Sequence, residues 1–420
     1  MKIAIYGLGN VGRGLLQIIR EQKPDIEIAG IVDRSYTRKK EILLDIPASD
    51  DPEFLLKNEN VDVHIELMGG LETAMVVVRE ALDRGKPVIT ANKALLAEHG
   101  YSLFFKSREK KAPIYFEAAI AGAIPIVTNI KNILGYQPLN EMQGILNGTT
   151  NFILTHMRTK QQSFHEVLVK AQSMGLAEAD PSLDINGTDA VHKLALLATL
   201  ITGKWFEYKN IYTSGIENIQ IKDMLWAEKM GYRIRLIAEF RREPAQTFAS
   251  VEPSMIDKNN FLWDVENENN AILLKGLYSN DHLFAGKGAG ALPTAYSVYT
   301  DLINLKNAFG GLLPDIREYA EISKTAETAD EFYLRLLVED KPGVLATVSE
   351  IFKKHKISIA KLHQESQNET QISDKVTTPP VDLIIVTHKC KRDDLNSALA
   401  EFEKEDFTQE HSILMPIKRS

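Results

Sequence analysis

The chain has 420 residues, which is more than one hydrophobic core usually accommodates, so we expect two or three domains. It is 44% hydrophobic and 25% charged, the composition of an ordinary globular protein. The formal net charge of −8 argues against nucleic acid as a partner, and no apolar run approaches the roughly 20 residues that span a bilayer. The single cysteine, Cys390, excludes an internal disulfide framework. The first residues have a strand pattern in place of a secretory signal, so we expect a cytoplasmic protein.

The N-terminal segment has the pattern of a dinucleotide-binding fold. An apolar strand over Lys2–Tyr6 is followed by Gly-x-Gly-x-x-Gly and then by apolar residues at helical spacing. In this context the first glycine allows a tight turn, the second lets the backbone approach a pyrophosphate, and the third lets the helix pack close to the strand. The helix N-terminus offers free N–H groups to the phosphates. The cofactor-binding residues expected in this loop are Gly7, Gly9, Asn10, Val11 and Gly12.

A second predicted strand, residues 26–32, ends in an acidic residue about 20 positions beyond the last glycine. There Asp33 would bind the ribose 2′-OH of NAD. Arg34 follows directly, and an arginine at this place would instead accommodate the 2′-phosphate of NADP. The residues alone therefore predict NAD(P) and leave the preference between NAD and NADP open.

The alternation of strands and helices continues along the first third of the chain. Strands are predicted at 61–66, 87–90 and 114–116, with helices at 73–83 and 95–106. This order predicts βαβ units, a parallel sheet and a ligand at the carboxyl ends of the strands. Lys93 follows one such strand end and would point towards the cofactor cleft. The alternative is a solvated lysine that begins a helix.

Residues 171–193 carry a glycine-punctuated loop and four carboxylates ahead of a lysine that begins an apolar helix. Asp189 and Lys193 are four positions apart, so a helix places them on one face. Beyond Lys193 the sequence LALLATLIT is apolar nearly all round, which is typical of a buried helix. A lysine in that place needs a partner, and its pKa is easily moved towards neutrality. The alternative is a capped helix with an ordinary salt bridge.

Together these features resemble the homoserine dehydrogenase family. The resemblance is carried by the signature spacing of Ala171, Gly175, Asp180, Pro181, Asp184, Gly187, Asp189 and Lys193. Residues 88–93 (VITANK), 144–151 (GILNGTTN) and 286–294 (GKGAGALPT) also resemble family segments, in the family's order. The resemblance covers about residues 1–326. It implies NAD(P)-dependent interconversion of L-homoserine, an amino-acid substrate, and L-aspartate 4-semialdehyde, a step towards threonine, methionine and isoleucine.

The resemblance also implies roles for individual residues. Lys193 would donate and accept the proton, and Lys93 would lie by the nicotinamide and the substrate. Glu178 and Asp189 would hold the homoserine, whereas the role of Asp184 stays open. Two glycines would line the cleft between cofactor and substrate, Gly175 and Gly290. Residues 148–151 are expected to form a turn with hydroxyl caps.

A structural sodium site is a further implication of the resemblance. Its ligands would be the carboxylate of Glu117 and the carbonyl oxygens of Ile120, Gly122 and Ile124. All of these are oxygen atoms, as a hard cation requires. The family also implies a homodimer or homotetramer, which nothing in the periodicity tests.

The C-terminal quarter is predicted to be a separate unit after a charged linker at 318–331. Strands are predicted at 332–338, 357–363, 381–387 and 412–416, and helices at 344–355 and 392–404. This βαββαβ order is the ferredoxin-like arrangement. Asp340 and Gly343, in the turn before the first helix, resemble an ACT domain, a module that often binds amino acids. The polar loop at 368–380 is longer than most hairpin loops, and the family resemblance implies threonine as an effector. The alternative is a domain that serves only dimerisation.

We therefore expect an α/β protein of three parts. These are an N-terminal Rossmann-type parallel sheet (1–128, completed by about 301–326), an α+β catalytic and dimerisation domain (129–300) and a ferredoxin-like ACT domain (331–420). One competing hypothesis is another ACT-bearing NAD-dependent dehydrogenase, which predicts a His–carboxylate or arginine constellation. The other is a catalytically silent sensor of nucleotides and amino acids, which predicts the loss of Lys193 or Glu178.

Overall fold

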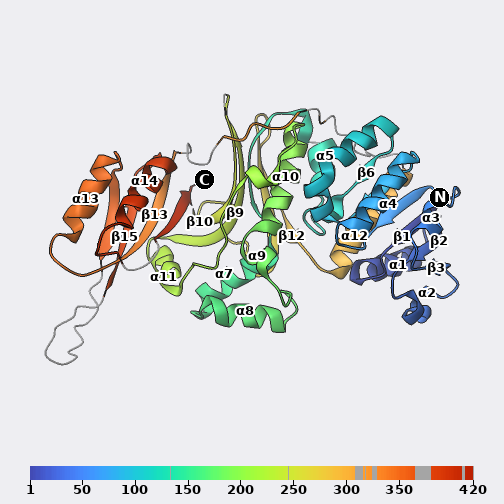
Figure 1. Cartoon of the computed structure of the whole chain (residues 1–420), viewed down its shortest axis with the longest axis horizontal. Helices are drawn as coiled ribbons and strands as arrows, with labels where there is room; N and C mark the ends of the chain where they lie inside the picture. The colour runs from blue at the N-terminus through green and yellow to red at the C-terminus, as the bar shows by residue number, and fades with distance from the viewer. Residues whose placement is uncertain are drawn as a thin grey trace.

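The computed structural model describes every residue except 133, 245, 308–315, 317, 324–328, 365–379, 409–411 and 420. Three units follow one another along the long axis, with the N-terminal unit at one end, the C-terminal unit at the other and the central unit between them (Figure 1). In this described part, no helix combines the length and apolar character needed to cross a membrane.

The N-terminal unit is a parallel sheet covered by helices, as predicted. In spatial order its strands are β3 (Ala48–Ser49), β2 (Glu27–Val32), β1 (Lys2–Tyr6), β4 (Val63–Glu66), β5 (Val88–Thr90) and β6 (Ile114–Tyr115). Its helices are α1 (Asn10–Gln22), α2 (Lys40–Leu43), α3 (Glu53–Leu56), α4 (Glu72–Asp83) and α5 (Lys93–Lys110). The strand order reverses between β1 and β4, which is where open α/β sheets bind ligands.

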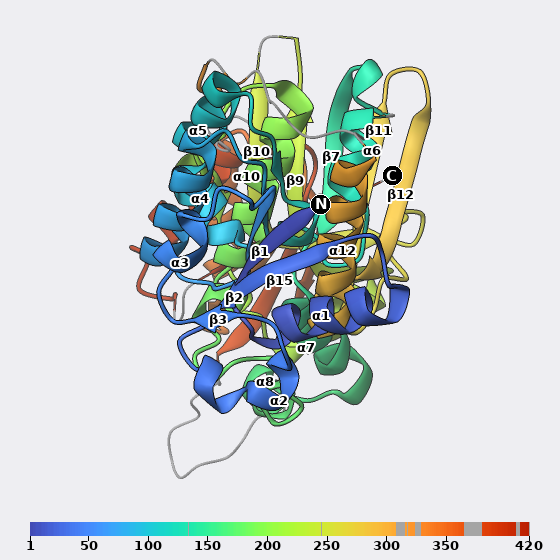
Figure 2. The ribbon, with the colours of Figure 1, turned by 90° about the vertical axis from the view of Figure 1, so that its right-hand side faces the viewer.

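The chain returns to this unit late in the sequence. Helix α12 (Ala291–Lys306) lies beside α1 in both views of the molecule (Figures 1 and 2). Three of its residues, Ala295, Val298 and Leu302, are fully buried and belong to the same hydrophobic cluster as β1 and α1. The core of the N-terminal unit thus depends on a helix almost 300 positions away from its first strand.

A second, mixed sheet forms the central unit. Its strands in spatial order are β12 (Asn280–Lys287), β11 (Asn269–Gly276), β7 (Leu139–Ile145), β9 (Tyr232–Arg242) and β10 (Thr247–Asp257), with β8 (Tyr212–Thr213) paired to β10. Figure 2 shows β12 at the free edge of this sheet. The helices of the unit are α6 (Ile126–Asn132), α7 (Gly148–Lys160), α8 (Phe164–Ser173), α9 (Ser182–Ile185), α10 (Thr188–Thr202) and α11 (Ile221–Lys229).

Helix α10 is the apolar helix that the sequence predicts, and it packs between α5 and strands β9 and β10. Its residues from Leu194 to Thr199 are all buried, so the helix is covered by protein nearly all round. The turn expected at 148–151 is wrong, since these residues form the first turn of α7. The reason is a cap just upstream: the side-chain oxygen of Asn147 accepts a hydrogen bond from the N–H of Thr150 (2.8 Å).

The C-terminal unit has the predicted ferredoxin-like order. Its strands lie in the order β17 (Ile413–Lys418), β13 (Ala329–Val338), β15 (Val381–Thr387) and β14 (Ile359–Gln364), with the helices α13 (Val344–Lys354) and α14 (Arg392–Phe402). A short strand that the sequence did not predict, β16 (Cys390–Lys391), pairs with the start of β13. The polar loop at 368–380 lies outside the described residues, apart from Pro380.

Two expectations about this unit are wrong. It is not separate, because β17 pairs in parallel with β10 of the central unit and makes the two sheets continuous. The predicted linker is also too long, since its last residues, 329–331, already belong to β13. Two of the charges in this segment are paired here: Asp330 with Lys418 (3.1 Å), and Glu331 with Arg419 (2.5 Å).

Buried charge pairs also join the C-terminal unit to the central unit. Asp223 on α11 accepts hydrogen bonds from Arg335 on β13 at 2.7 and 3.2 Å. Arg392 contacts Glu252 at 2.5 Å. Breaking a buried pair on one side leaves an unpaired charge, which costs several kcal/mol, so these contacts fix the two units against each other.

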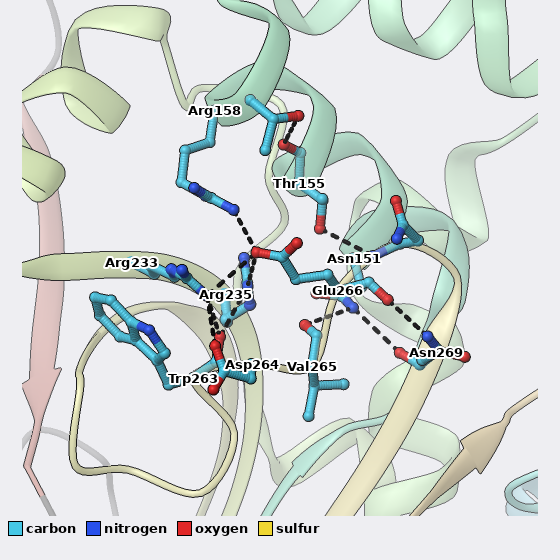
Figure 3. A network of polar contacts seen from close by, with 12 residues as sticks. Asn151, Thr155, Arg158, Arg233, Arg235, Trp263, Asp264, Val265, Glu266 and Asn269 are labelled. Carbon is cyan, nitrogen blue, oxygen red and sulfur yellow. Dashed lines mark hydrogen bonds and ion pairs between the residues drawn. The ribbon is translucent and has the colours of Figure 1, made fainter.

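A cluster of arginines holds the loop between β10 and β11. Arg158 on α7 and Arg233 and Arg235 on β9 all converge on the carboxylate of Glu266 (Figure 3). Arg233 and Arg235 also donate to the carbonyl of Trp263, at 2.8 and 3.2 Å. We call these four residues, Arg158, Arg233, Arg235 and Glu266, the Glu266 cluster. It fastens the loop to one helix and one strand of the central unit.

Candidate active site

A cleft of about 770 Å³ opens between the N-terminal sheet and the central unit. Its walls come from the ends of β4 and β5, from the first turns of α5, α7 and α12, and from the loop between α8 and α9. The residues that the sequence singles out and that line it are Val11, Lys93, Ile120, Gly175, Glu178, Asp184, Asp189, Lys193 and Gly290. The structure therefore brings the predicted substrate and proton-transfer residues into one place.

Asp189 lies at the centre of the charged groups in the cleft. Its Oδ2 is 2.7 Å from Nζ of Lys193, one turn further along α10, and its Oδ1 is 2.9 Å from Nζ of Lys93 at the start of α5. Nζ of Lys193 also donates to the carbonyl oxygen of Leu146 (2.7 Å). The Lys193 side chain is 9% exposed and that of Lys93 is 40% exposed. Two lysines from different domains thus share one buried carboxylate.

The two lysines differ in their proton affinity. Burial lowers the pKa of Lys193, and the charge of Lys93 lowers it further, while Asp189 opposes the drop. The charge of Asp189 raises the pKa of Lys93. Burial alone would raise the pKa of Asp189, but Lys193 and then Lys93 hold it well below its usual range. Asp189 is therefore the fixed anion, and Lys193 is the lysine moved towards proton exchange at neutral pH.

Asn147 is a central residue of the site that the sequence did not single out. Its Nδ2 donates to Asp184 Oδ1 (2.7 Å) and to Asp189 Oδ2 (2.9 Å), while its Oδ1 caps α7. Burial raises the pKa of Asp184, and this hydrogen bond opposes the rise. Asn147 therefore ties the loop before α10 to the start of α7. The available signal was an asparagine one position before the predicted turn, which is a typical helix cap.

The remaining predicted cofactor residues do not line the cleft: Gly7, Gly9, Asn10 and Gly12 belong to the turn between β1 and α1 and to the start of α1, and Asp33 and Arg34 follow β2. Gly7 has φ +103°, and a Cβ on Gly12 would lie 2.2 Å from the carbonyl oxygen of Gly7. A Cβ on Gly9 would meet no atom within 4 Å. The loop thus makes a turn that needs glycine, packs α1 tightly and leaves an open backbone face at the helix N-terminus, which fits a pyrophosphate.

Asp33 makes several hydrogen bonds within the protein that the sequence does not predict. It accepts hydrogen bonds from the N–H of Leu8 (2.8 Å), from Ser35 and from Nζ of Lys39 (2.7 Å). Burial would raise the pKa of Asp33, but these donors lower it to about 2. Arg34 is exposed beside this pair. The carboxylate thus holds the glycine loop through the N–H of Leu8.

The residues of the predicted sodium site lie in the segment between β6 and α6. The buried carboxylate of Glu117 accepts from the N–H of Val127 (2.7 Å) and from the N–H (2.8 Å) and hydroxyl (2.6 Å) of Thr128. The carbonyl of Gly122 accepts from the hydroxyl of Ser297 (2.5 Å). A second buried carboxylate, Asp301, lies beside Glu117, and burial and this neighbour raise its pKa. The two acids supply oxygen atoms, the ligand type of a hard cation, but both oxygens of Glu117 and the carbonyl oxygen of Gly122 already accept hydrogen bonds.

The cleft does not favour the competing dehydrogenase hypothesis. Among the described residues that line it, there is neither a histidine nor an arginine. The silent-sensor hypothesis predicts the loss of Lys193 or Glu178, yet both line the cleft.

Three family models match the chain. Residues 7–117 match the NAD-binding domain of homoserine dehydrogenase, residues 125–303 match homoserine dehydrogenase, and residues 332–407 match the ACT domain. The chain is 35% identical over 421 residues to the homoserine dehydrogenase of Pseudomonas aeruginosa, covering 96% of this chain and 95% of that protein. It is 34% identical over 411 residues to that of Helicobacter pylori, with 96% and 95% covered.

Solved structures agree with these matches. A homoserine dehydrogenase from Thiobacillus denitrificans superposes with a TM-score of 0.91 at 32% identity, over 100% of this chain and 98% of that one. A mutant hyperthermophilic archaeal homoserine dehydrogenase in complex with NADPH superposes with a TM-score of 0.65 at 26% identity, over 74% of this chain and 99% of that one.

Proposed function

This chain belongs to the homoserine dehydrogenase family, the NAD(P)-dependent oxidoreductases that interconvert L-homoserine and L-aspartate 4-semialdehyde, and we propose how its own residues divide that work. The observation that carries the proposal is the sharing of Asp189 by Lys193 and Lys93 at the bottom of the cleft. The arrangement places one lysine with a lowered pKa beside a second, permanently charged one.

Lys193 is the proposed proton-transfer residue. Bound NAD(P) supplies or accepts the hydride, so the protein has only the proton and the charge on oxygen to manage. When homoserine is oxidised, neutral Lys193 takes the hydroxyl proton. When the semialdehyde is reduced, the protonated amine stabilises the developing alkoxide and returns the proton. Lys93, which stays charged, supplies further positive potential at the same oxygen.

Glu178 and Asp189 are the proposed anchors for the amino-acid part of the substrate. Both line the cleft, and their negative charge suits an ammonium group. Asp189 has both oxygens engaged by lysines, so its additional role is to hold the two amines in place. Asp184, held by Asn147, supports this loop. Gly175 and Gly290, which both line the cleft, would leave room there for cofactor and substrate.

For the cofactor we propose the glycine loop, Gly7 to Gly12, as the pyrophosphate site and Asp33 with Arg34 as the ribose site. For sodium we propose Glu117 with the carbonyls of Ile120, Gly122 and Ile124. That ion would order the segment between β6 and α6 and balance the two buried acids there.

The wider organisation is also proposed. The Rossmann-type domain takes residues 1–128, completed by about 301–326, the catalytic and dimerisation domain takes 129–300, and the ACT domain takes 331–420. The family model for the ACT domain supports a regulatory role, for which we propose threonine as effector. We further propose a homodimer or homotetramer that works in the cytoplasm.

The decisive experiment measures homoserine-dependent reduction of NAD+ and of NADP+ by the purified full chain, with and without threonine. We expect turnover that needs homoserine, and inhibition by threonine. Light scattering of the same sample gives the oligomeric state. Absence of homoserine-dependent turnover with both cofactors would contradict the proposed roles as a whole, whereas unchanged turnover in threonine would contradict only the effector.

A further inference from the structure

Glu66 is a buried acid in the cleft that none of the roles above uses. It is the last residue of β4, at the switch point next to β1. Its exposed fraction is 0%, yet it belongs to the lining of the cleft together with its neighbours Met68, Gly69 and Asn92. A carboxylate is rarely buried without a partner of opposite charge, so its surroundings need an explanation.

The groups around Glu66 are hydrogen-bond donors. Its Oε2 accepts from the hydroxyl of Thr90 (2.6 Å), and its Oε1 accepts from the N–H of Met68 (2.8 Å). The Thr90 oxygen itself accepts from the N–H of Asn92 (3.0 Å), so its proton is directed to Glu66. Burial raises the pKa of Glu66, and these donors counter the rise. An acid that only accepts hydrogen bonds is satisfied in its ionised form.

Glu66 also lacks a cationic partner. In the described part of the chain no ion pair joins it to a lysine or arginine, in contrast to Asp189, which contacts two lysines. Its negative charge is therefore held by neutral dipoles and remains uncompensated next to the cleft. In a buried place such a charge acts more strongly on neighbouring charges than it would in water.

We propose that Glu66 sets the relative affinity of the cleft for the oxidised and the reduced nicotinamide cofactor. The nicotinamide ring is positively charged when oxidised and neutral when reduced, so a fixed anion at its binding place favours the oxidised form. The inference rests on the proposed function, which puts the nicotinamide beside Lys93. Lys93 directly follows Asn92, one of the residues that surround the Glu66 carboxylate. Glu66 thereby opposes the charge of Lys93, which favours the neutral ring.

The test compares dissociation constants of NADP+ and NADPH, measured by titration calorimetry without homoserine, in the wild type and in Glu66→Gln. The amide keeps the shape and one acceptor but removes the charge. We expect the ratio of the NADP+ constant to the NADPH constant to rise about tenfold, because only the oxidised cofactor loses an attraction. An equal weakening of both cofactors would overturn the proposal and leave Glu66 as a structural brace.

Glu66→Asp is the matched control. It shortens the side chain but keeps the carboxylate, so both constants change together and their ratio stays within about twofold of the wild type. A ratio that rises about tenfold in Glu66→Asp would also overturn the proposal, even if Glu66→Gln does not fold. Failure of the wild type to bind either cofactor would contradict the proposed function instead, so the two failures are distinguishable.

Discussion

Asp189 and Glu266 are each shared by several cations, and the two carboxylates serve different purposes. In the cleft, Asp189 contacts Lys193 and Lys93. In the Glu266 cluster, the carboxylate contacts three arginines (Figure 3). Burial lowers the pKa of the cations Lys193 and Arg235, because removing water penalises the charged form. A second cation nearby lowers each pKa further.

The type of cation decides the outcome. The ordinary pKa of a lysine is 10.5, so a lowered pKa allows Lys193 to exchange protons near neutral pH. The ordinary pKa of an arginine is much higher, at 12.5. Burial and the nearby Arg158 lower the pKa of Arg235 to about 9, so this fully buried arginine stays protonated at neutral pH. The same geometry is therefore a proton-transfer site with lysines and a structural brace with arginines.

The largest effect is expected for Lys193. Lys193→Ala removes the proton-transfer group, and kcat for homoserine oxidation should fall by about 10²–10⁴-fold. Lys193→Arg restores a cation beside Asp189 but not an exchangeable proton, so it should fall nearly as far. Steady-state kinetics of the two variants, with circular dichroism to confirm folding, checks this. Near-full activity in the arginine variant would show that charge alone is what the site needs.

Asp189→Asn should have the second largest effect. It leaves two amines without their anion, and we expect kcat/KM to fall by about tenfold to a hundredfold, the cost of unpairing a buried charge. Asp189 raises the pKa of Lys193, so its loss lowers that pKa. Since oxidation needs neutral Lys193, the acidic limb of the pH–rate profile should move to lower pH. A limb that moves to higher pH would contradict this assignment.

Glu266→Gln should affect stability and leave catalysis largely intact. It removes the anion that three arginines share, and unfolding in urea should show a loss of about 1–3 kcal/mol. The kcat of the folded fraction should stay within about twofold of the wild type. If instead kcat falls a hundredfold at unchanged stability, the Glu266 cluster belongs to the active site and the comparison fails.

The smallest effect is expected for an exposed ion pair. Lys57 contacts Glu53 one helical turn away, with both side chains more than 60% exposed. Lys57→Ala should leave both the urea midpoint of unfolding and turnover the same as in the wild type, because solvent screens an exposed ion pair. This variant serves as the baseline for the other three, and a loss of stability as large as that of Glu266→Gln would call for another explanation of their effects.

The parts of the site that could be predicted are those set by residues close together in the sequence. Asp189 and Lys193 are one helical turn apart, so spacing alone placed them on one face. The glycine loop is equally local, and its strand and helix begin and end close to where the pattern puts them. The confirmed predictions about the fold, the parallel N-terminal sheet and the order of helices and strands, follow from such short-range periodicity.

Long-range contacts account for what the sequence did not provide. Asn147 reaches Asp184 and Asp189 across about 40 positions, and no local pattern specifies that meeting. The pairing of β17 with β10 joins strands more than 150 positions apart, so the C-terminal unit looked separate. Glu66 is one acid at a strand end, and only its burial among donors sets it apart.

The central claim is that Lys193 transfers the proton with a pKa set by its neighbours, and Lys93→Met tests it most directly. The charge of Lys93 lowers the pKa of Lys193, so removing that charge raises it. The measurement is kcat/KM for homoserine oxidation against pH, in the wild type and in Lys93→Met. The account predicts that the acidic limb moves to higher pH, opposite to Asp189→Asn, whatever the loss in rate. An acidic limb at the same pH in both proteins would contradict it.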